Sequence, residues 1–252
     1  MANEIDLLTF KGFPNQTISN ITLISTPLTR AAQEFARAHD DPVSPFIYNH
    51  VMRSWLFGAL IISRNSTLAA SVDLEVHAAA TLLHDLGWDR TPGSGVVSGD
   101  RRFEVDGAEA GRRFIAGFTD TTGHDGEGEG NEWDERRLQL VWDAIALHTE
   151  RRIAYFKELE VQVVSRGIAL DFEDPKGEVV RGYGITEEEY GAVVGEFGRE
   201  GFKRGVNETV VWLCGSKPGS TIDTWMQPWG DRYVANYSSR GRQRIDSIFA
   251  NL

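Results

Sequence analysis

The segment 78–87, AAATLLHDLG, constrains the fold most, because an unbroken apolar run ends in adjacent histidine and aspartate residues. Alanine and leucine have the highest helix propensities among apolar residues, so the run predicts a helix. Gly87 is expected to end this helix in the left-handed conformation. Neighbouring helical side chains point about 100° apart, so His84 and Asp85 can reach one metal ion only at a helix end, where they lie.

The size and apolar content of the chain are sufficient for one large domain. Its 252 residues are 41% hydrophobic, enough to bury a substantial core. We assign a single domain to residues 1–252, with a core at about 26–215. An N-terminal arm is expected at 1–25 and a C-terminal arm at 216–252.

Charge and cysteine content limit the partners and the compartment. The formal net charge of -11 disfavours binding to nucleic acid or to an acidic membrane, so we expect a small-molecule substrate. Cys214 is the single cysteine, and the N-terminus lacks the pattern of a signal peptide. No apolar run approaches the roughly 20 residues of a membrane helix. These features predict a cytoplasmic protein.

Capping residues and apolar spacing predict helices along most of the chain. Ser or Thr followed by Pro begins a helix near residues 27 and 45, and Thr186 with Glu189 predicts a capping box. The expected helices span about 26–38, 45–63, 74–86, 102–114, 133–149, 186–197, 202–214 and 240–249. Segment 161–164 fits either a helix or a strand, and 217–229 is expected to be irregular. The pattern predicts an all-α fold with long connections.

Besides His84, three histidines lie within these expected helices. His50 lies among apolar residues and is either a core residue or a metal ligand. His148 is expected to face the core, because it shares a side with apolar residues of its helix. His77 is expected to be partly exposed.

The order of these residues resembles a known metal-binding pattern. A histidine within a helix (His50), a His-Asp pair at the end of a later helix (His84 and Asp85) and a distant aspartate (Asp171) resemble the H…HD…D pattern of the HD-domain superfamily of metal-dependent hydrolases. The segments 102–108, 142–149 and 167–172 are similar to the branch of this superfamily that includes fungal cyanamide hydratase. The resemblance covers about residues 45 to 175 and implies an HD-domain helical fold.

The resemblance implies that His50, His84, Asp85 and Asp171 are the metal ligands. Taken alone, Asp171 also fits a turn cap, and Asp174 lies three residues further on. Two imidazoles and two carboxylates suit Zn²⁺ best and Fe²⁺ second. Dinuclear members of the superfamily have a further histidine four residues before a Gly-Ala pair, where this chain has Phe103. A phenyl ring cannot coordinate, so a single divalent ion is expected.

Three other residues are candidates for proton transfer beside the ion. A divalent ion with an open position lowers the pKa of bound water to about 7, and Asp85 is expected to accept the water proton. His148 and Glu104 are candidates to donate a proton to the substrate, and Asp106 is a weaker candidate. Carboxylates are also favoured in the first turn of a helix, which explains Glu104 and Asp106 equally well.

These expectations leave three functions open. The resemblance favours a hydratase or hydrolase that adds metal-activated water to a small nitrile, cyanamide or isonitrile. The first alternative is phosphohydrolysis of a nucleotide or small phosphomonoester, for which Arg53, Arg101 and Arg102 are candidate phosphate ligands. The second is an HD module that binds a ligand without turnover. A homodimer is compatible with all three.

Overall fold

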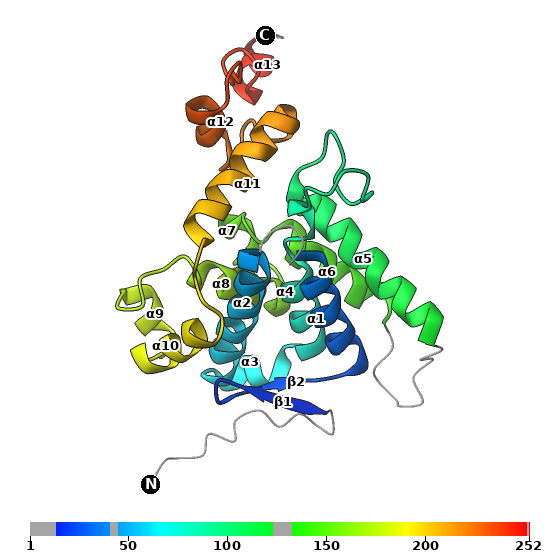
Figure 1. Ribbon diagram of the computed structural model, residues 1–252, viewed down its shortest axis with the longest axis vertical. Helices are drawn as coiled ribbons and strands as arrows, with labels where there is room; N and C mark the ends of the chain where they lie inside the picture. The colour runs from blue at the N-terminus through cyan, green and yellow to red at the C-terminus, as the bar shows by residue number, and fades with distance from the viewer. Residues whose placement is uncertain (1–13, 41–44, 123–132, 251) are drawn as a thin grey trace.

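The computed structural model describes residues 14–40, 45–122, 133–250 and 252. Within this part of the chain the structure is mostly helical, with thirteen α-helices, two short 3-10 helices and one two-stranded sheet (Figure 1). The prediction of an all-α fold is confirmed. No helix among the described residues combines the length and the apolar character needed to cross a lipid bilayer.

Six helices form the body of the molecule. They are α1 (Pro27–Asp40), α2 (Pro45–Ser63), α4 (Leu74–Leu83), α5 (Phe103–Thr122), α6 (Glu135–Ala146) and α8 (Leu159–Leu170). The remaining helices are α3 (Ser66–Ser71), α7 (Arg151–Ala154), α9 (Glu178–Gly182), α10 (Glu187–Glu196), α11 (Phe202–Ser216), α12 (Gln227–Tyr233) and α13 (Arg244–Ala250). The two 3-10 helices are η1 (Leu86–Trp88) and η2 (Pro218–Ser220).

Helix α4 is the centre of this body. It packs against α1, α2, α5, α6 and α8, and every residue from Glu75 to Leu83 is buried. A helix that is apolar on all sides is stable only when it is surrounded by others. The small side chains of 78–80 let these neighbours approach, so the end of α4 lies in the interior of the body.

Helices α2 and α8 pack closely beside α4 because glycines meet at their crossing. A Cβ atom added at Gly167 would lie 2.7 Å from the Ser54 carbonyl oxygen and 2.9 Å from the Gly58 nitrogen. The short distance between the backbones brings the C-terminal end of α8 next to the middle of α2. Residues 161–164, for which the sequence left helix and strand open, lie within helix α8.

The N-terminal region differs from the predicted arm. Residues 15–24 form an antiparallel hairpin of β1 (Asn15–Ile18) and β2 (Ile21–Ile24), and Leu23 and Ile24 belong to the hydrophobic core. Ile21 and Leu23 of β2 are buried and Thr22 between them is less so, which is the period of 2 that a strand gives. Residues 1–13 of the predicted arm lie outside the described residues.

Gly87 does not have the predicted role. It lies inside η1 and its φ angle is not positive, so it does not end α4 in a left-handed conformation. Helix α4 ends earlier, at Leu83, with His84 as its C-cap. Glycine is required at position 87 for another reason: a Cβ atom there would lie 2.0 Å from the carbonyl oxygen of Phe103. The turn after α4 therefore packs directly against the start of α5.

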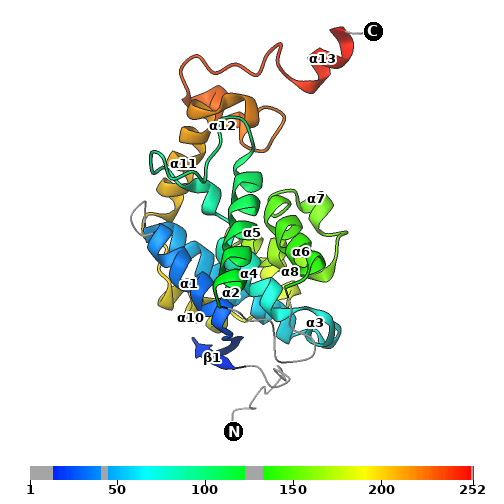
Figure 2. The ribbon, with the colours of Figure 1, turned by 90° about the vertical axis from the view of Figure 1, so that its right-hand side faces the viewer.

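The C-terminal part of the chain extends from one end of the body, with α11, α12 and α13 in succession (Figures 1 and 2). The expected irregular stretch 217–229 contains η2 and the start of α12. Residues as far along the chain as Met226 belong to the same hydrophobic cluster as α4. This segment is therefore part of the packed structure up to α12.

Candidate metal centre

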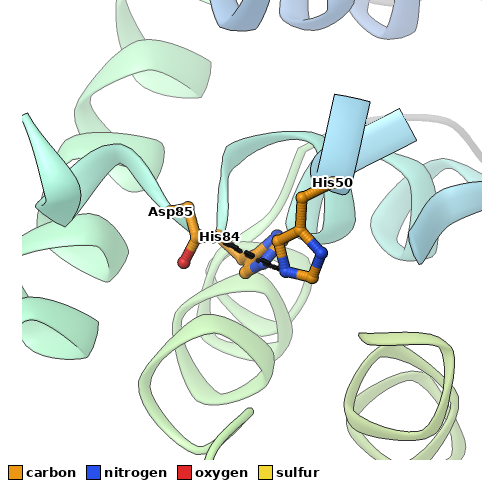
Figure 3. A group of neighbouring side chains, drawn as sticks. All are labelled: His50, His84 and Asp85. Carbon is orange, nitrogen blue, oxygen red and sulfur yellow. Dashed lines mark hydrogen bonds and ion pairs between the residues drawn. The ribbon is translucent and has the colours of Figure 1, made fainter. Parts of the chain in front are cut away.

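Two histidines and one aspartate converge in the interior beside the end of α4 (Figure 3). His50 comes from α2, and His84 and Asp85 come from the turn between α4 and η1. The Nε2 atoms of His50 and His84 are 3.3 Å apart. Asp85 Oδ2 lies 3.2 Å from His84 Nε2 and 3.7 Å from His50 Nε2. All three side chains are buried, so the predicted pair and His50 are brought together.

Hydrogen bonds at the other ring nitrogens determine which atoms of the two imidazoles face the cluster. Nδ1 of His84 lies 2.8 Å from the Thr81 carbonyl oxygen, and Nδ1 of His50 lies 2.6 Å from Asp171 Oδ2. Carbonyl and carboxylate oxygens can only accept, so each Nδ1 carries the proton and donates it. In neutral rings the Nε2 lone pairs then point toward one another and toward Asp85.

The Asp85 carboxylate is buried beside the two imidazoles. Among the described residues neither of its oxygens accepts a hydrogen bond while both rings are neutral, and the nearest ring atom is His84 Nε2, 3.2 Å from Oδ2. Burial disfavours the charged form, but His84 and His50 outweigh burial and lower the pKa of Asp85. The same pairing outweighs burial at His84 and raises its pKa. An ionised buried carboxylate needs a cation beside it, either a proton on His84 or a metal ion.

These residues fit a divalent metal ion. Two imidazole Nε2 atoms and one carboxylate are typical ligands of Zn²⁺ and Fe²⁺, and three protein ligands leave a position for water. The hydrogen bonds from Nδ1 are those that usually orient metal-bound histidines. With both imidazoles neutral, a metal ion would give the two Asp85 oxygens a partner that no described protein group then supplies.

The structure does not bring the fourth predicted ligand, Asp171, into this group. Asp171 is the C-cap of α8, and its carboxylate lies on the opposite side of the His50 ring from the cluster. Arg53 binds both of its oxygens, at 2.7 and 2.8 Å, and Arg199 donates to Oδ1 at 2.8 Å. Burial opposes ionisation, but His50 and Arg53 lower the pKa of Asp171 to about 2. This placement favours a role in orienting His50 over direct metal binding.

Glu104 is buried behind the cluster and is held by several donors. Arg102 binds its Oε1 at 2.5 Å, Thr149 Oγ1 donates at 2.6 Å, and Trp225 Nε1 donates at 3.3 Å. Burial disfavours the charge, but Arg102 outweighs burial and lowers the pKa of Glu104. An ionised carboxylate with these partners is a poor proton donor. The predicted catalytic role stays a prediction, and the geometry favours positioning of Thr149 and Trp225.

Asp106 is engaged in a buried ion pair. Its Oδ2 lies 2.6 Å from Lys217 Nζ and accepts from the backbone N–H of Ser98 at 3.0 Å. Arg101 lies 3.1 Å from Oδ1. Asp106 thus connects α5 to the loop before it and to the segment after α11. Its predicted part in catalysis also stays a prediction.

His148 lies next to the cluster, as expected for a residue that faces the core. Its ring is 5.0 Å from that of His84 between centroids and 5.6 Å from that of Phe103. Nδ1 of His148 donates to the Ile145 carbonyl oxygen at 2.7 Å. Burial, followed by the neighbouring His84, lowers its pKa to about 4. A neutral His148 therefore presents an unprotonated Nε2, which accepts a proton more readily than it donates one.

A cavity of about 370 Å³ opens onto these residues. Its polar lining residues are His50, Asp85, His148, Thr149 and Arg151. Its aromatic lining residues are Trp88, Phe103, Phe172, Trp225 and Trp229. Neither Glu104 nor Asp106 lines it. The cluster therefore forms the polar end of an otherwise apolar cavity.

Several of these residues carried no recognisable sequence signal. Arg199, which binds Asp171, lies in a connection 28 residues further along the chain, and nothing local indicates that contact. The tryptophans at 225 and 229 are part of a Trp-rich stretch, which was the available signal for an aromatic binding surface.

Comparison with known proteins adds no name to this site. No protein-family model matches the chain, and no curated protein matches it. The interpretation of the cluster therefore depends on its geometry and on the chemistry of its residues.

Proposed function

We propose that this protein is a mononuclear metal-dependent hydratase of the HD type, which adds water to a nitrile-, cyanamide- or isonitrile-type substrate. The observation that carries the proposal is the cluster itself. Two Nε2 atoms and an Asp85 carboxylate without hydrogen bonds meet at the end of an apolar cavity. Zn²⁺ is the first choice of ion and Fe²⁺ the second. When bound, such an ion lowers the pKa of water and polarises an electrophile.

The surroundings of the cluster suit a neutral substrate better than a phosphate ester. Phosphate would require arginine or lysine side chains that are available to it. The three sequence candidates are engaged with carboxylates: Arg53 with Asp171, Arg101 with Asp106 and Arg102 with Glu104. None of these arginines lines the cavity. This distribution of charge favours hydration over phosphohydrolysis.

One observation keeps phosphohydrolysis as the second candidate. Arg151 lines the cavity, and among the described residues it is the cavity's one arginine or lysine. Its side chain is 46% exposed and lies 3.6 Å from Glu173. Exposed ion pairs of this kind are weak, so Arg151 is available to a charged ligand at the mouth.

A protein side chain is available for the two proton transfers that a hydration requires. When water adds across the C≡N bond of a nitrile or cyanamide, an O–C bond forms, a π bond breaks and the nitrogen takes up a proton; for an isonitrile the terminal carbon takes up both the hydroxyl group and the proton. The unprotonated Nε2 of His148 accepts the proton from water and returns it to the nitrogen, and tautomerisation gives the amide. The apolar walls exclude other water molecules.

The test combines metal analysis with a substrate screen. Purified protein is analysed for metal, loaded with Zn²⁺ or Fe²⁺, and incubated with cyanamide and nitriles and, separately, with a panel of nucleotides and phosphomonoesters. We expect about one metal ion per chain and amide or urea products. Phosphate release without any amide or urea would refute the hydratase in favour of the second candidate. Two metal ions per chain would contradict the mononuclear site.

Variants of the cluster provide the matched controls. His84→Ala and Asp85→Ala should lose the metal ion and the activity while keeping the helical circular dichroism. His39→Ala removes a histidine that pairs with Asp89 outside the cluster and should keep both metal and activity. Normal metal content in His84→Ala or Asp85→Ala would show that the ion is bound elsewhere.

A further inference from the structure

The cavity is much larger than cyanamide or acetonitrile requires. Its volume of about 370 Å³ lies in the range of pockets that enclose drug-sized ligands, about 300–1,000 Å³. A substrate with only a few heavy atoms would leave most of this space to water, next to apolar walls. The space therefore indicates a substrate with a substantial apolar body.

One wall of the cavity is a continuous row of aromatic rings. It runs from His148 beside the cluster to Phe103, then to Trp225 and Trp229, with centroid distances of 5.6, 6.4 and 5.8 Å. The successive interplanar angles are 71°, 79° and 80°, so each ring meets the next edge to face. Aromatic ligands pack favourably against rings in this arrangement. The row begins where the reaction is proposed to occur and leads away from it.

The indole rings of this row are fixed in place. Trp225 Nε1 donates to Glu104 Oε1 at 3.3 Å, and Trp229 Nε1 donates to Asn207 Oδ1 at 3.0 Å. Both indole N–H groups are thus used, and the two tryptophans contribute apolar ring surface to the cavity. A wall whose polar atoms are already paired binds an apolar group without leaving a buried donor unsatisfied.

The remaining lining residues are apolar as well. They are Ile168 and Ala169 at the end of α8, Phe172 after it, and Val206 on α11. The Phe172 side chain, although it lines the cavity, is 49% exposed. An aromatic ligand in the cavity would cover part of this exposed surface.

From these observations we infer that the substrate carries its C≡N or N≡C group on an aromatic ring, and that the walls formed by Val206, Trp225 and Trp229 set this preference. The reactive group of the inferred substrate rests on the proposed hydratase function. The aromatic body of that substrate is inferred from the cavity alone. The body of the ligand is uncharged, because the walls that would surround it are aromatic and aliphatic side chains, and Arg151 is the one arginine or lysine among the described lining residues.

Binding of the amide products tests the aromatic preference without interference from turnover. Benzamide and acetamide are titrated into the metal-loaded protein by isothermal calorimetry. Burial of a phenyl group is expected to make benzamide bind about 10- to 100-fold more tightly than acetamide. In parallel, kcat/KM is measured for benzonitrile, acetonitrile and cyanamide, and the value for benzonitrile should be the highest.

A size series at position 206 locates the ligand in the cavity. Val206→Phe fills the space and should weaken benzamide binding at least tenfold, with little change for acetamide. Val206→Ala enlarges the space and should retain the preference for benzamide. Both variants should keep the wild-type metal content and a cooperative thermal transition, which excludes misfolding as the cause.

The outcomes separate this inference from the proposed function. If cyanamide or acetonitrile is hydrated but benzamide binds no more tightly than acetamide, the hydratase stands and the aromatic preference is overturned. If benzamide binds tightly and Val206→Phe abolishes this, but no nitrile is hydrated, the aromatic cavity is supported and the hydratase is refuted. Equal benzamide binding by Val206→Phe and wild type would place the ligand outside the cavity and overturn the inference.

Discussion

Asp171 shows how the role of one residue depends on which side of a ring it occupies. The sequence resemblance implies a ligand, whereas the structure places its carboxylate on Nδ1 of His50, opposite the cluster. A carboxylate in this position fixes the tautomer of the imidazole and increases its basicity toward a metal ion. The pairing with Arg53 keeps the carboxylate ionised and oriented.

The variant Asp171→Asn distinguishes the two roles. Loss of a partner that orients a metal ligand typically weakens metal binding by about 10- to 100-fold, whereas loss of a ligand removes most of the binding. We expect the weaker effect, measured by competition with a chromophoric chelator. Asp174→Asn, three residues away and exposed, is the control and should bind metal like the wild type. Complete loss of metal in Asp171→Asn would make Asp171 a ligand, as the resemblance implies.

His148 is expected to contribute to turnover without holding the ion. It lies outside the group of three ligand residues, and its Nε2 is unprotonated because burial lowers its pKa to about 4. Replacement of a general base typically reduces the rate by about 100-fold or more. His148→Gln should therefore keep one metal ion per chain and lose kcat for the hydrated substrate. Loss of the ion from this variant would instead identify His148 as a third imidazole ligand.

At the scale of elements, the sequence predicts helices well where a capping residue precedes apolar residues at helical spacing. Helix α2 has the predicted bounds, and the capping box of Thr186 and Glu189 forms at the start of α10. The short hairpin at 15–24 was missed because two four-residue strands give too few alternations to distinguish from loop. Contacts between distant segments, such as that of Asp106 with Lys217, leave no periodic signal in the sequence.

The same limit applies to the site. His84 and Asp85 were singled out by their residue types at a helix end, whereas His50 was expected to be a ligand only because of the family resemblance. The placement of Asp171 on the other side of His50 was not predictable, since it depends on the close crossing of α2 and α8 and on two arginines. Residue type identifies the possible ligands, and packing decides which of them point inward.

The contact between η1 and α5 gives an element-scale prediction. A methyl group at position 87 would lie 2.0 Å from the Phe103 carbonyl oxygen, so Gly87→Ala must push the two backbones apart. This displaces the turn that holds His84 and Asp85, and we expect destabilisation by about 1–3 kcal/mol, as for overpacking of a core, with weaker metal binding. Thermal unfolding and metal titration measure the two effects.

The control for this variant is another glycine within a helix. Gly191 lies in α10, and a Cβ atom there meets nothing within 4 Å. Gly191→Ala should stabilise the protein by about 0.5–1 kcal/mol, because alanine loses less conformational entropy in a helix. If Gly87→Ala behaved like Gly191→Ala, the packing of η1 against α5 would not be as described.

At the scale of the whole molecule, buried histidines make the folded state sensitive to acid. His77 was expected to be partly exposed, but it is 2% exposed, and its Nε2 has no hydrogen-bond partner among the residues that the structure describes. Burial lowers its pKa to about 4. Between pH 6.5 and 4 the unfolded chain therefore binds a proton at this residue that the folded protein does not. The free energy of unfolding must fall as the pH decreases through this window.

The variant His77→Met isolates this contribution. Since one pKa unit corresponds to about 1.36 kcal/mol, the wild type should lose on the order of 3 kcal/mol through His77 between pH 7 and 4. Methionine does not titrate and adapts to irregular space, so the variant should lack this share while remaining close to wild type at pH 7. Urea unfolding of both proteins at several pH values gives the free energy of unfolding of each. His148 and the carboxylates contribute equally in both proteins, so the difference between the two curves is the contribution of His77. Parallel stability curves for the two proteins down to pH 4 would show that His77 takes up its proton in the folded state as readily as in the unfolded one.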